Sequence, residues 1–161
     1  MVLRFLCRTI WTLPGFAAMG LSLAWALSAH ALAGPAASIT IRVENLSAAG
    51  GILRLGLYDR AHYPDDNSRP VAFADVKVTG TEMVINLHGI APGAYAIETF
   101  QDLNANGEMD MNWLGFPEEP FGFSRDVRPH LRKPSFNQVA FTLAPGENMQ
   151  VIHMQTSVSI L

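Results

Sequence analysis

The sequence lacks three features that would place it in a familiar class of protein. Its 161 residues include one cysteine, Cys7, so no disulfide can form within the chain. No segment after residue 33 keeps a helical period for three turns, which argues against a helical domain. The G-x-S-x-G, H-E-x-x-H and phosphate-binding glycine motifs of well-known enzymes are also missing. Evidence on the fold and function must therefore come from the strands and loops that the sequence does contain.

The N-terminal segment has the pattern of a secretory signal peptide. Arg4 and Arg8 form a basic start, residues 13–27 are almost wholly apolar, and residues 31–33 (Ala-Leu-Ala) give a small-x-small cleavage site. We therefore expect residues 1–33 to be a signal peptide and the protein to be periplasmic or secreted. An uncleaved membrane anchor is the alternative, but glycines and a proline interrupt the apolar run.

Cleavage there would leave a single acidic domain, residues 34–161, without cysteine. Nine Lys and Arg would face fourteen Asp and Glu, for a net charge of about −5. An acidic domain has no electrostatic reason to bind nucleic acid or anionic lipid, so we expect neither partner and no stable membrane insertion after cleavage. Without disulfides, its stability must come from packing or from a bound ion.

Apolar and polar residues alternate in several short segments of this domain. The segments are residues 39–43, 53–58, 83–88, 95–99, 139–143 and 149–153. A period of two buries one face of a strand, and the connections are rich in Gly, Pro, Asn and Asp. We predict an all-β fold, an antiparallel two-sheet sandwich of the immunoglobulin-like or transthyretin-like kind, with about seven strands.

One long connection, residues 101–134, has no regular period. Loops of this length inside a compact domain are usually functional or disordered, and this one is too aromatic for disorder. We predict an ordered loop that caps one end of the sandwich. Its large rings either plug that end as core residues or form a platform for a sugar or a peptide. The candidate ligand-binding residues are Trp113, Phe116, Glu118 and Phe121.

The first part of this loop has the spacing of a calcium-binding segment. Oxygen-bearing side chains alternate along it, with Gly107 at the sixth position, where the chain must turn sharply. An EF-hand would place a bidentate Glu at the twelfth position, where this chain has Trp113, so a shorter calcium site is the hypothesis. The candidate ligands are the side chains of Asp102, Asn104, Asn106 and Asp110 and the carbonyl of Glu108.

Three other interpretations of this segment stay open. Asp and Asn also form Asx-turns, with the acids neutralised by the bases that follow, namely Arg125, Arg128, Arg132 and Lys133. A pair of the acids, drawn from Asp102, Asp110, Glu118 and Glu119, would suit the acid and base of a hydrolase. Copper(I) held by Met109 and Met111, or by His153 and Met154, is a further alternative, although Met is more often a core residue.

Two longer segments resemble a known family. LHGIAPGAYAIETFQDLNANGEMDMNWLGFPEEPFGFS (87–124) and PSFNQVAFTL (134–143) resemble a family of secreted bacterial domains of unknown function, number 2141. The resemblance extends from about Ile39 to Gln155 and implies an extracytoplasmic β-sandwich without an established activity. INLHGIAPGAYAIETF (85–100) is also similar to a turn of transthyretin-like and collagen-adhesin B-type repeats. Gln101 stands where the family pattern would have His, so no role for a histidine is carried over.

These observations favour a non-catalytic module over an enzyme. We expect an exported domain that binds a protein or carbohydrate at its capped end, with calcium as the candidate cofactor. The alternatives are a hydrolase that uses the loop carboxylates and a purely structural envelope protein. In the structural alternative, the loop would be buried against the sheet rather than open.

Overall fold

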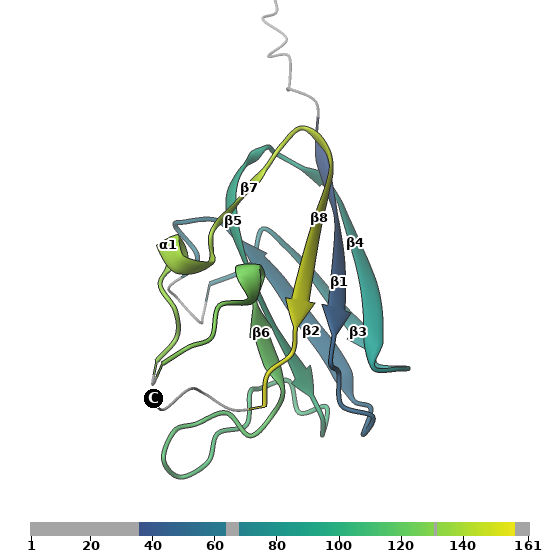
Figure 1. Ribbon diagram of the computed structural model, residues 1–161, viewed down its shortest axis with the longest axis vertical. Helices are drawn as coiled ribbons and strands as arrows, with labels where there is room; N and C mark the ends of the chain where they lie inside the picture. The colour runs from purple at the N-terminus through teal and green to yellow at the C-terminus, as the bar shows by residue number, and fades with distance from the viewer. Residues whose placement is uncertain (1–35, 64–67, 131, 157–161) are drawn as a thin grey trace, which may run out of the picture. The chain divides into compact units, whose positions relative to one another are not determined.

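The alternating segments of the sequence form two β-sheets that stack face to face (Figure 1). The computed structural model describes residues 36–63, 68–130 and 132–156, so the predicted signal peptide, residues 1–33, lies outside the described residues. The strands are β1 (Ala37–Glu44), β2 (Ile52–Tyr58), β3 (Ala72–Lys77), β4 (Glu82–Ile90), β5 (Gly93–Asp102), β6 (Phe121–Phe123), β7 (Phe141–Leu143) and β8 (Gly146–His153). Two short helical elements, η1 (Ser124–Asp126) and α1 (Phe136–Val139), lie between β6 and β7.

One sheet has three strands in the order β4-β1-β8, and the other has the order β3-β2-β5-β6, with β7 paired to β5 as well. All pairs are antiparallel except β1 with β8, which run parallel. A parallel pair needs a long connection, and here the first and last of the described strands meet after the whole fold has intervened. The predicted all-β, two-sheet sandwich is confirmed, with eight strands in the described part of the chain.

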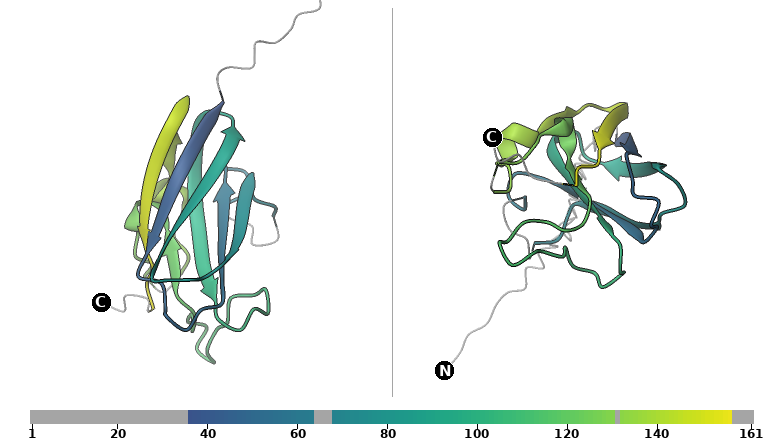
Figure 2. Two further views of the ribbon diagram at one scale, coloured as in Figure 1. Left: turned by 90° about the vertical axis from the view of Figure 1, so that its right-hand side faces the viewer. Right: turned by 60° about the horizontal axis from the view of Figure 1, so that its bottom comes forward.

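The main core fills the space between the two sheets. Alternate residues of β1, among them Ile39 and Ile41, are at most 1% exposed and face Leu53, Leu57 and Ile97 of the other sheet. Burying one such aliphatic side chain stabilises the fold by about 1.5–3 kcal/mol. The two views of Figure 2 show the sheets lying against each other along most of their length. The period of two in the sequence thus corresponds to this single buried interface.

A second, smaller core lies on the outer face of the five-stranded sheet. It consists of Tyr63, Ala96, Phe121, Phe123, Phe136 and Val139. These residues come from β5, from β6, from α1 and, in the case of Tyr63, from the connection between β2 and β3. Strand β5 is therefore buried on both faces over Tyr95–Ile97, which is why polar residues do not alternate there.

The predicted loop, residues 101–134, contains regular structure. Residues 101 and 102 complete β5, and residues 121–126 form β6 and η1. The irregular segment before β6, residues 103–120, projects as an arm beyond the end of the sheets (Figure 1). At the base of this arm, Phe121 and Gln155 exchange two backbone hydrogen bonds of 2.9 and 2.7 Å. None of the helices in the described residues is long and apolar enough to cross a membrane.

Candidate functional site

The arm begins at a buried ion pair. Asp102, the last residue of β5, is 0% exposed, and its Oδ2 accepts a hydrogen bond of 2.7 Å from Nε of Arg54 on β2. The same carboxylate accepts bonds from the backbone amides of Asn106 (3.1 Å) and Gly107 (2.9 Å). Burial by itself raises the pKa of Asp102, but Arg54 and these two amides outweigh it, so the pKa lies below its usual value.

The other polar side chains of the arm bind one another and the backbone. The amide nitrogens of Asn104 and Asn106 donate to the two oxygens of Asp110, at 2.6 and 3.0 Å. Their amide oxygens accept backbone N–H groups, those of Asn106 and Glu108, at 2.9 and 2.8 Å. These are Asx-turns, in which a short side chain replaces a backbone hydrogen bond.

A buried glutamate closes the base of the arm. Glu119 is 3% exposed, and its two oxygens accept the backbone amides of Leu103 (2.7 Å) and Asp110 (3.2 Å). Glu119 thus ties the outgoing part of the arm to the returning part. Glu118 is exposed, and its backbone amide donates to the carbonyl of Asp110 at 2.9 Å.

These contacts favour the Asx-turn interpretation of the acidic segment. The oxygens of the candidate calcium ligands Asp102, Asn104, Asn106 and Asp110 point toward N–H donors. Within the described ranges, no group of three or more His, Cys, Asp or Glu side chains is arranged to hold a metal ion. The base that neutralises Asp102 is Arg54, not one of the later bases. Arg125 donates to the carbonyl of Gln138, and Lys133 pairs with Glu98 at 2.7 Å.

The copper candidates have different surroundings. Met109 is packed against the second core, whereas Met111 is 54% exposed, and both line one groove. Met154 is buried in the main core, and the ring of His153 contacts two carboxylates at the surface. The side chains of His153 and Met154 therefore lie in different environments and do not meet around one point.

The tip of the arm is a tight hairpin. Oδ1 of Asn112 accepts the backbone amides of Leu114 (2.9 Å) and Phe116 (3.1 Å), and Gly115 has a φ of 80°, which suits glycine. Trp113 stands at this tip with 90% of its surface exposed. Trp113 is thus neither a plug of the sandwich nor part of the groove described next.

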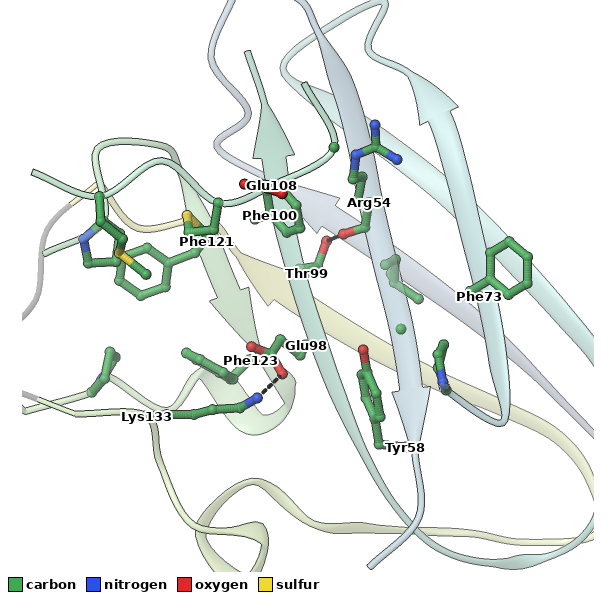
Figure 3. A pocket seen from close by; sticks show the side chains of 18 of the residues that line it. Arg54, Tyr58, Phe73, Glu98, Thr99, Phe100, Glu108, Phe121, Phe123 and Lys133 are labelled. Atoms are coloured by element: carbon green, nitrogen blue, oxygen red, sulfur yellow. Dashed lines mark hydrogen bonds and ion pairs between the residues drawn. The ribbon is translucent and has the colours of Figure 1, made fainter. Parts of the chain in front are cut away.

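A groove with a volume of about 1060 Å³ lies between the arm and the outer face of the five-stranded sheet. The sheet contributes Arg54, Tyr58, Phe73, Asp75, Glu98 and Phe100 to its floor. The arm and the chain after η1 contribute walls that include Met109, Phe116, Pro117, Pro129, Arg132 and Lys133. Figure 3 shows labelled side chains of the groove on β2, β3, β5 and β6 and on the segment that carries Lys133.

The strand registers arrange the floor in two rows. One row crosses the sheet from Phe73 through Gly56 and Glu98 to Phe123. The other crosses from Asp75 through Arg54 and Phe100 to Phe121. Each row therefore combines aromatic rings with charged side chains. Two ion pairs lie in the groove, Arg54 with Asp75 at 3.0 Å and Lys133 with Glu98 at 2.7 Å.

The predicted ligand-binding residues divide between this groove and its surroundings. Phe116 and Phe121 line the groove, while Trp113 and Glu118 do not. Sequence reasoning missed Arg54, Tyr58 and Phe73 because they lie on strands far from the arm in sequence. The one available signal was Gly56, a glycine inside an otherwise apolar and alternating strand.

Gln101 has a structural role. It is 0% exposed, its Nε2 donates to the carbonyls of Ser47 and Gly50, and its Oε1 accepts the amide of Ser47 at 2.7 Å. The side chain thereby fixes the turn between β1 and β2 against the end of β5. A buried amide with these partners has no free group for chemistry.

Comparison with known proteins gives one family. A family model described as an uncharacterized protein conserved in bacteria (DUF2141) matches residues 41–151, which is more than half of the chain. Neither the curated proteins nor the solved structures gave a match.

Proposed function

The chain belongs to this uncharacterized bacterial family, DUF2141, and we propose that it is a non-catalytic binding module exported by the signal at residues 1–33. The ligand occupies the groove on the outer face of the five-stranded sheet. The observation that carries this proposal is the groove itself, whose volume of about 1060 Å³ is large enough for a small ligand or a segment of a polymer. Its aromatic floor and few charged side chains are typical of a binding site.

The state of the carboxylates supports a module without catalytic activity. Three of the four candidate carboxylates, Asp102, Asp110 and Glu119, each accept two or more hydrogen bonds from N–H groups of the protein. A general acid must carry a proton and a general base must have a free lone pair directed at the substrate. Carboxylates that serve as acceptors for the arm are better suited to fixing its shape.

The rigidity of the arm supports binding in a preformed site. Hydrogen bonds from backbone amides to the side-chain oxygens of Asp102, Glu119 and Asn112 fix its base and its tip. Little conformational entropy is then lost when a ligand contacts the wall of the groove, and this favours affinity. A purely structural protein would have no need of such an open, ordered wall.

Binding can be tested with the uncharged fluorescent probe N-phenyl-1-naphthylamine, whose emission rises in apolar sites. We expect saturable binding to the purified protein. A Cβ added at Gly56 would lie 2.5 Å from the ring of Tyr58, so Gly56→Val should move that ring and reduce binding. The matched control is Gly80→Val, because a Cβ at Gly80 meets no atom closer than 3.8 Å.

A second variant, Phe73→Ser, tests the same groove if Gly56→Val does not fold. Phe73 is 68% exposed, so Phe73→Ser leaves the core intact and should still weaken probe binding. Absence of saturable binding by the folded parent protein would reject the groove as a ligand site and favour the structural alternative.

Export has its own test. Residues 1–40 fused to alkaline phosphatase should give activity in bacterial cells, because that reporter needs disulfides that form outside the cytoplasm. Replacing Arg4 and Arg8 by Glu should abolish the activity, since the basic start is lost. An inactive fusion of the unaltered segment would reject the signal peptide.

A further inference from the structure

We infer that the ligand of the groove is a neutral, β-linked glycan whose sugar rings stack on Tyr58 and Phe73. This inference rests on the proposed function, because it names the chemical class of ligand for the same groove. Four observations on the floor of the groove lead to it: a ring that leans over a glycine, a second aromatic residue on the next strand, polar pairs on both sides, and a balance of charge.

The ring of Tyr58 leans over Gly56. Two ring carbons and the hydroxyl oxygen of Tyr58 are within 2.5–2.8 Å of the place where a Cβ of Gly56 would stand. The absence of a side chain at this position therefore lets the ring approach the backbone of its own strand. Tyr58 of β2 lies between Glu98 of β5 and Phe73 of β3 (Figure 3). Aromatic rings are the surfaces on which the C–H groups of a sugar ring pack.

A second aromatic residue lies one strand away. Phe73 of β3 is the direct cross-strand partner of Gly56 and is 68% exposed. Because the ring of Tyr58 leans over Gly56, the two aromatic residues belong to the same part of the floor, on neighbouring strands. Consecutive sugars of an extended β-linked chain can therefore contact both. A β-1,4-linked chain with equatorial substituents is flat and suits this arrangement.

Polar side chains flank the rings on both sides. Arg54 and Asp75 form one pair next to the Phe73–Gly56 row, and Glu98, the other cross-strand partner of Gly56, pairs with Lys133. The side chain of Asp75 is 47% exposed, and those of Glu98 and Lys133 are 30% and 28% exposed. Each pair thus keeps accessible donors and acceptors. The hydroxyl groups at the edge of a stacked sugar can bond to them.

The charges select against other ligands. Both pairs are neutral overall, and the charges of Arg69 and Arg132, which also line the groove, are offset by Glu108 and by Asp102, which binds Arg54, so a strongly charged ligand gains little net attraction. An acyl chain would cover the pairs without offering them hydrogen bonds, which is unfavourable for buried polar groups. A neutral glycan has apolar ring faces and polar edges, and so satisfies both the aromatic residues and the pairs.

The test uses four probes with the purified protein: cellopentaose and chitopentaose as flat β-1,4-linked chains, maltopentaose as a curved one, and decanoate as an acyl chain. Isothermal titration calorimetry measures binding directly, and displacement of N-phenyl-1-naphthylamine places it in the groove. We expect at least one flat pentasaccharide to bind and to displace the dye, and to do so better than maltopentaose or decanoate.

Variants identify the surface that binds. Phe73→Ala should weaken binding of the flat pentasaccharide by about tenfold or more, a loss typical of an aromatic contact at the centre of a site. Tyr58→Ala should weaken binding to a similar extent. If Tyr58→Ala does not fold, the result for Phe73→Ala alone is decisive. Trp113→Ala is the control, since Trp113 lies at the tip of the arm and outside the groove. Its affinity for the probe should be unchanged.

The outcomes separate this inference from the proposed function. Dye binding with no binding of either flat pentasaccharide, or displacement by decanoate alone, would overturn the glycan and leave the groove as a site for another ligand. Sugar binding lost in Trp113→Ala and kept in Phe73→Ala would also overturn it, because the tip would then be the site. No binding of dye or sugar would reject the proposed function as well.

Discussion

Nε of Arg54 lies 2.7 Å from Oδ2 of Asp102, diagonally across the pair of strands β2 and β5. Arg54 is the cross-strand partner of Phe100, and Asp102 is the partner of Ile52. The ion pair holds the residue at which the chain leaves the sheet to form the arm, residues 103–120. Since that arm is one wall of the groove, the pair sets the width of the groove from its base.

Replacing Arg54 by Met should destabilise the protein by about 3 kcal/mol, because a buried carboxylate then loses the charge that compensates it. The measurement is urea unfolding, with the change read from the midpoint at constant slope. The control is Arg42→Met. Arg42 contacts Glu44 and Glu82 at 3.7 and 3.6 Å near the surface, and such pairs contribute about 1 kcal/mol or less. Equal losses in the two variants would contradict the role given to Asp102.

Calcium should not stabilise the protein. The oxygens that a calcium ion would need already accept hydrogen bonds from Arg54, from two Asn side chains and from backbone amides. An ion bound only by the folded state at a hundred times its Kd would add about 2.7 kcal/mol and raise Tm by several degrees. We expect the Tm in EDTA and in millimolar Ca²⁺ to agree within about 1 °C, well below that shift.

A rise specific to Ca²⁺, absent with Mg²⁺ and removed by Asp110→Ala, would contradict this expectation. It would support the calcium site that the spacing of residues 102–110 predicts. The Asx-turns would then describe only the ion-free state of the arm.

Truncation of two aromatic residues in the predicted loop should have very different effects on the free energy of unfolding. Phe121 is 3% exposed and belongs to the second core, so Phe121→Ala should cost about 3 kcal/mol or more of unfolding free energy. Trp113 is 90% exposed, so Trp113→Ala should change it by about 0.5 kcal/mol or less. Urea unfolding of both variants measures the difference. A large loss in Trp113→Ala would show that the tip packs against the protein.

The sandwich could be predicted from the sequence because its main core is a single interface between two sheets. A strand such as β1, with one face on that interface, has the regular alternation of buried and half-buried residues that the sequence displays. Strand β3 was not predicted from the sequence, because its alternation is weak. Its sequence, AFADVK, alternates only between half-buried and exposed positions, and two of its six residues are Ala. A strand at the edge of a sheet gives a weak hydrophobic signal.

The groove could not be predicted, because it is formed by pairings that the sequence does not display. Gly56 lies in the floor of the groove because strand pairing places Phe73 and Glu98 on either side of it. The partner of Asp102 was sought among the bases that follow it, yet Arg54 lies 48 positions before it. Strand β6 has three residues, too few for a period to be recognised, so Phe121 and Phe123 were assigned to the loop.

His153 joins the end of β8 to two other parts of the fold. Its Nδ1 lies 2.6 Å from Oδ2 of Asp126 in η1, and its Nε2 lies 3.3 Å from Oε2 of Glu44 at the end of β1. Its backbone amide donates to Asp126 at 2.8 Å. The hydrogen bond and charge of Asp126, followed by the charge of Glu44, raise the pKa of His153 above its ordinary value of 6.5.

The sign of the resulting pH dependence follows from this raised pKa. The charged ring stabilises the folded state fully below pH 6.5, and the stabilisation is lost as the pH rises through the higher pKa of the folded state. His153→Gln should therefore lower stability at about pH 5 by more than at about pH 9, with a difference of about 1 kcal/mol or less because the ring is half exposed. Urea unfolding at several pH values measures the difference, and His88→Gln, at an exposed site on β4, is the control. If His153→Gln lowers the midpoint equally at both pH values, the bonds of the ring act through geometry alone, and its charge contributes nothing to holding β8 against η1.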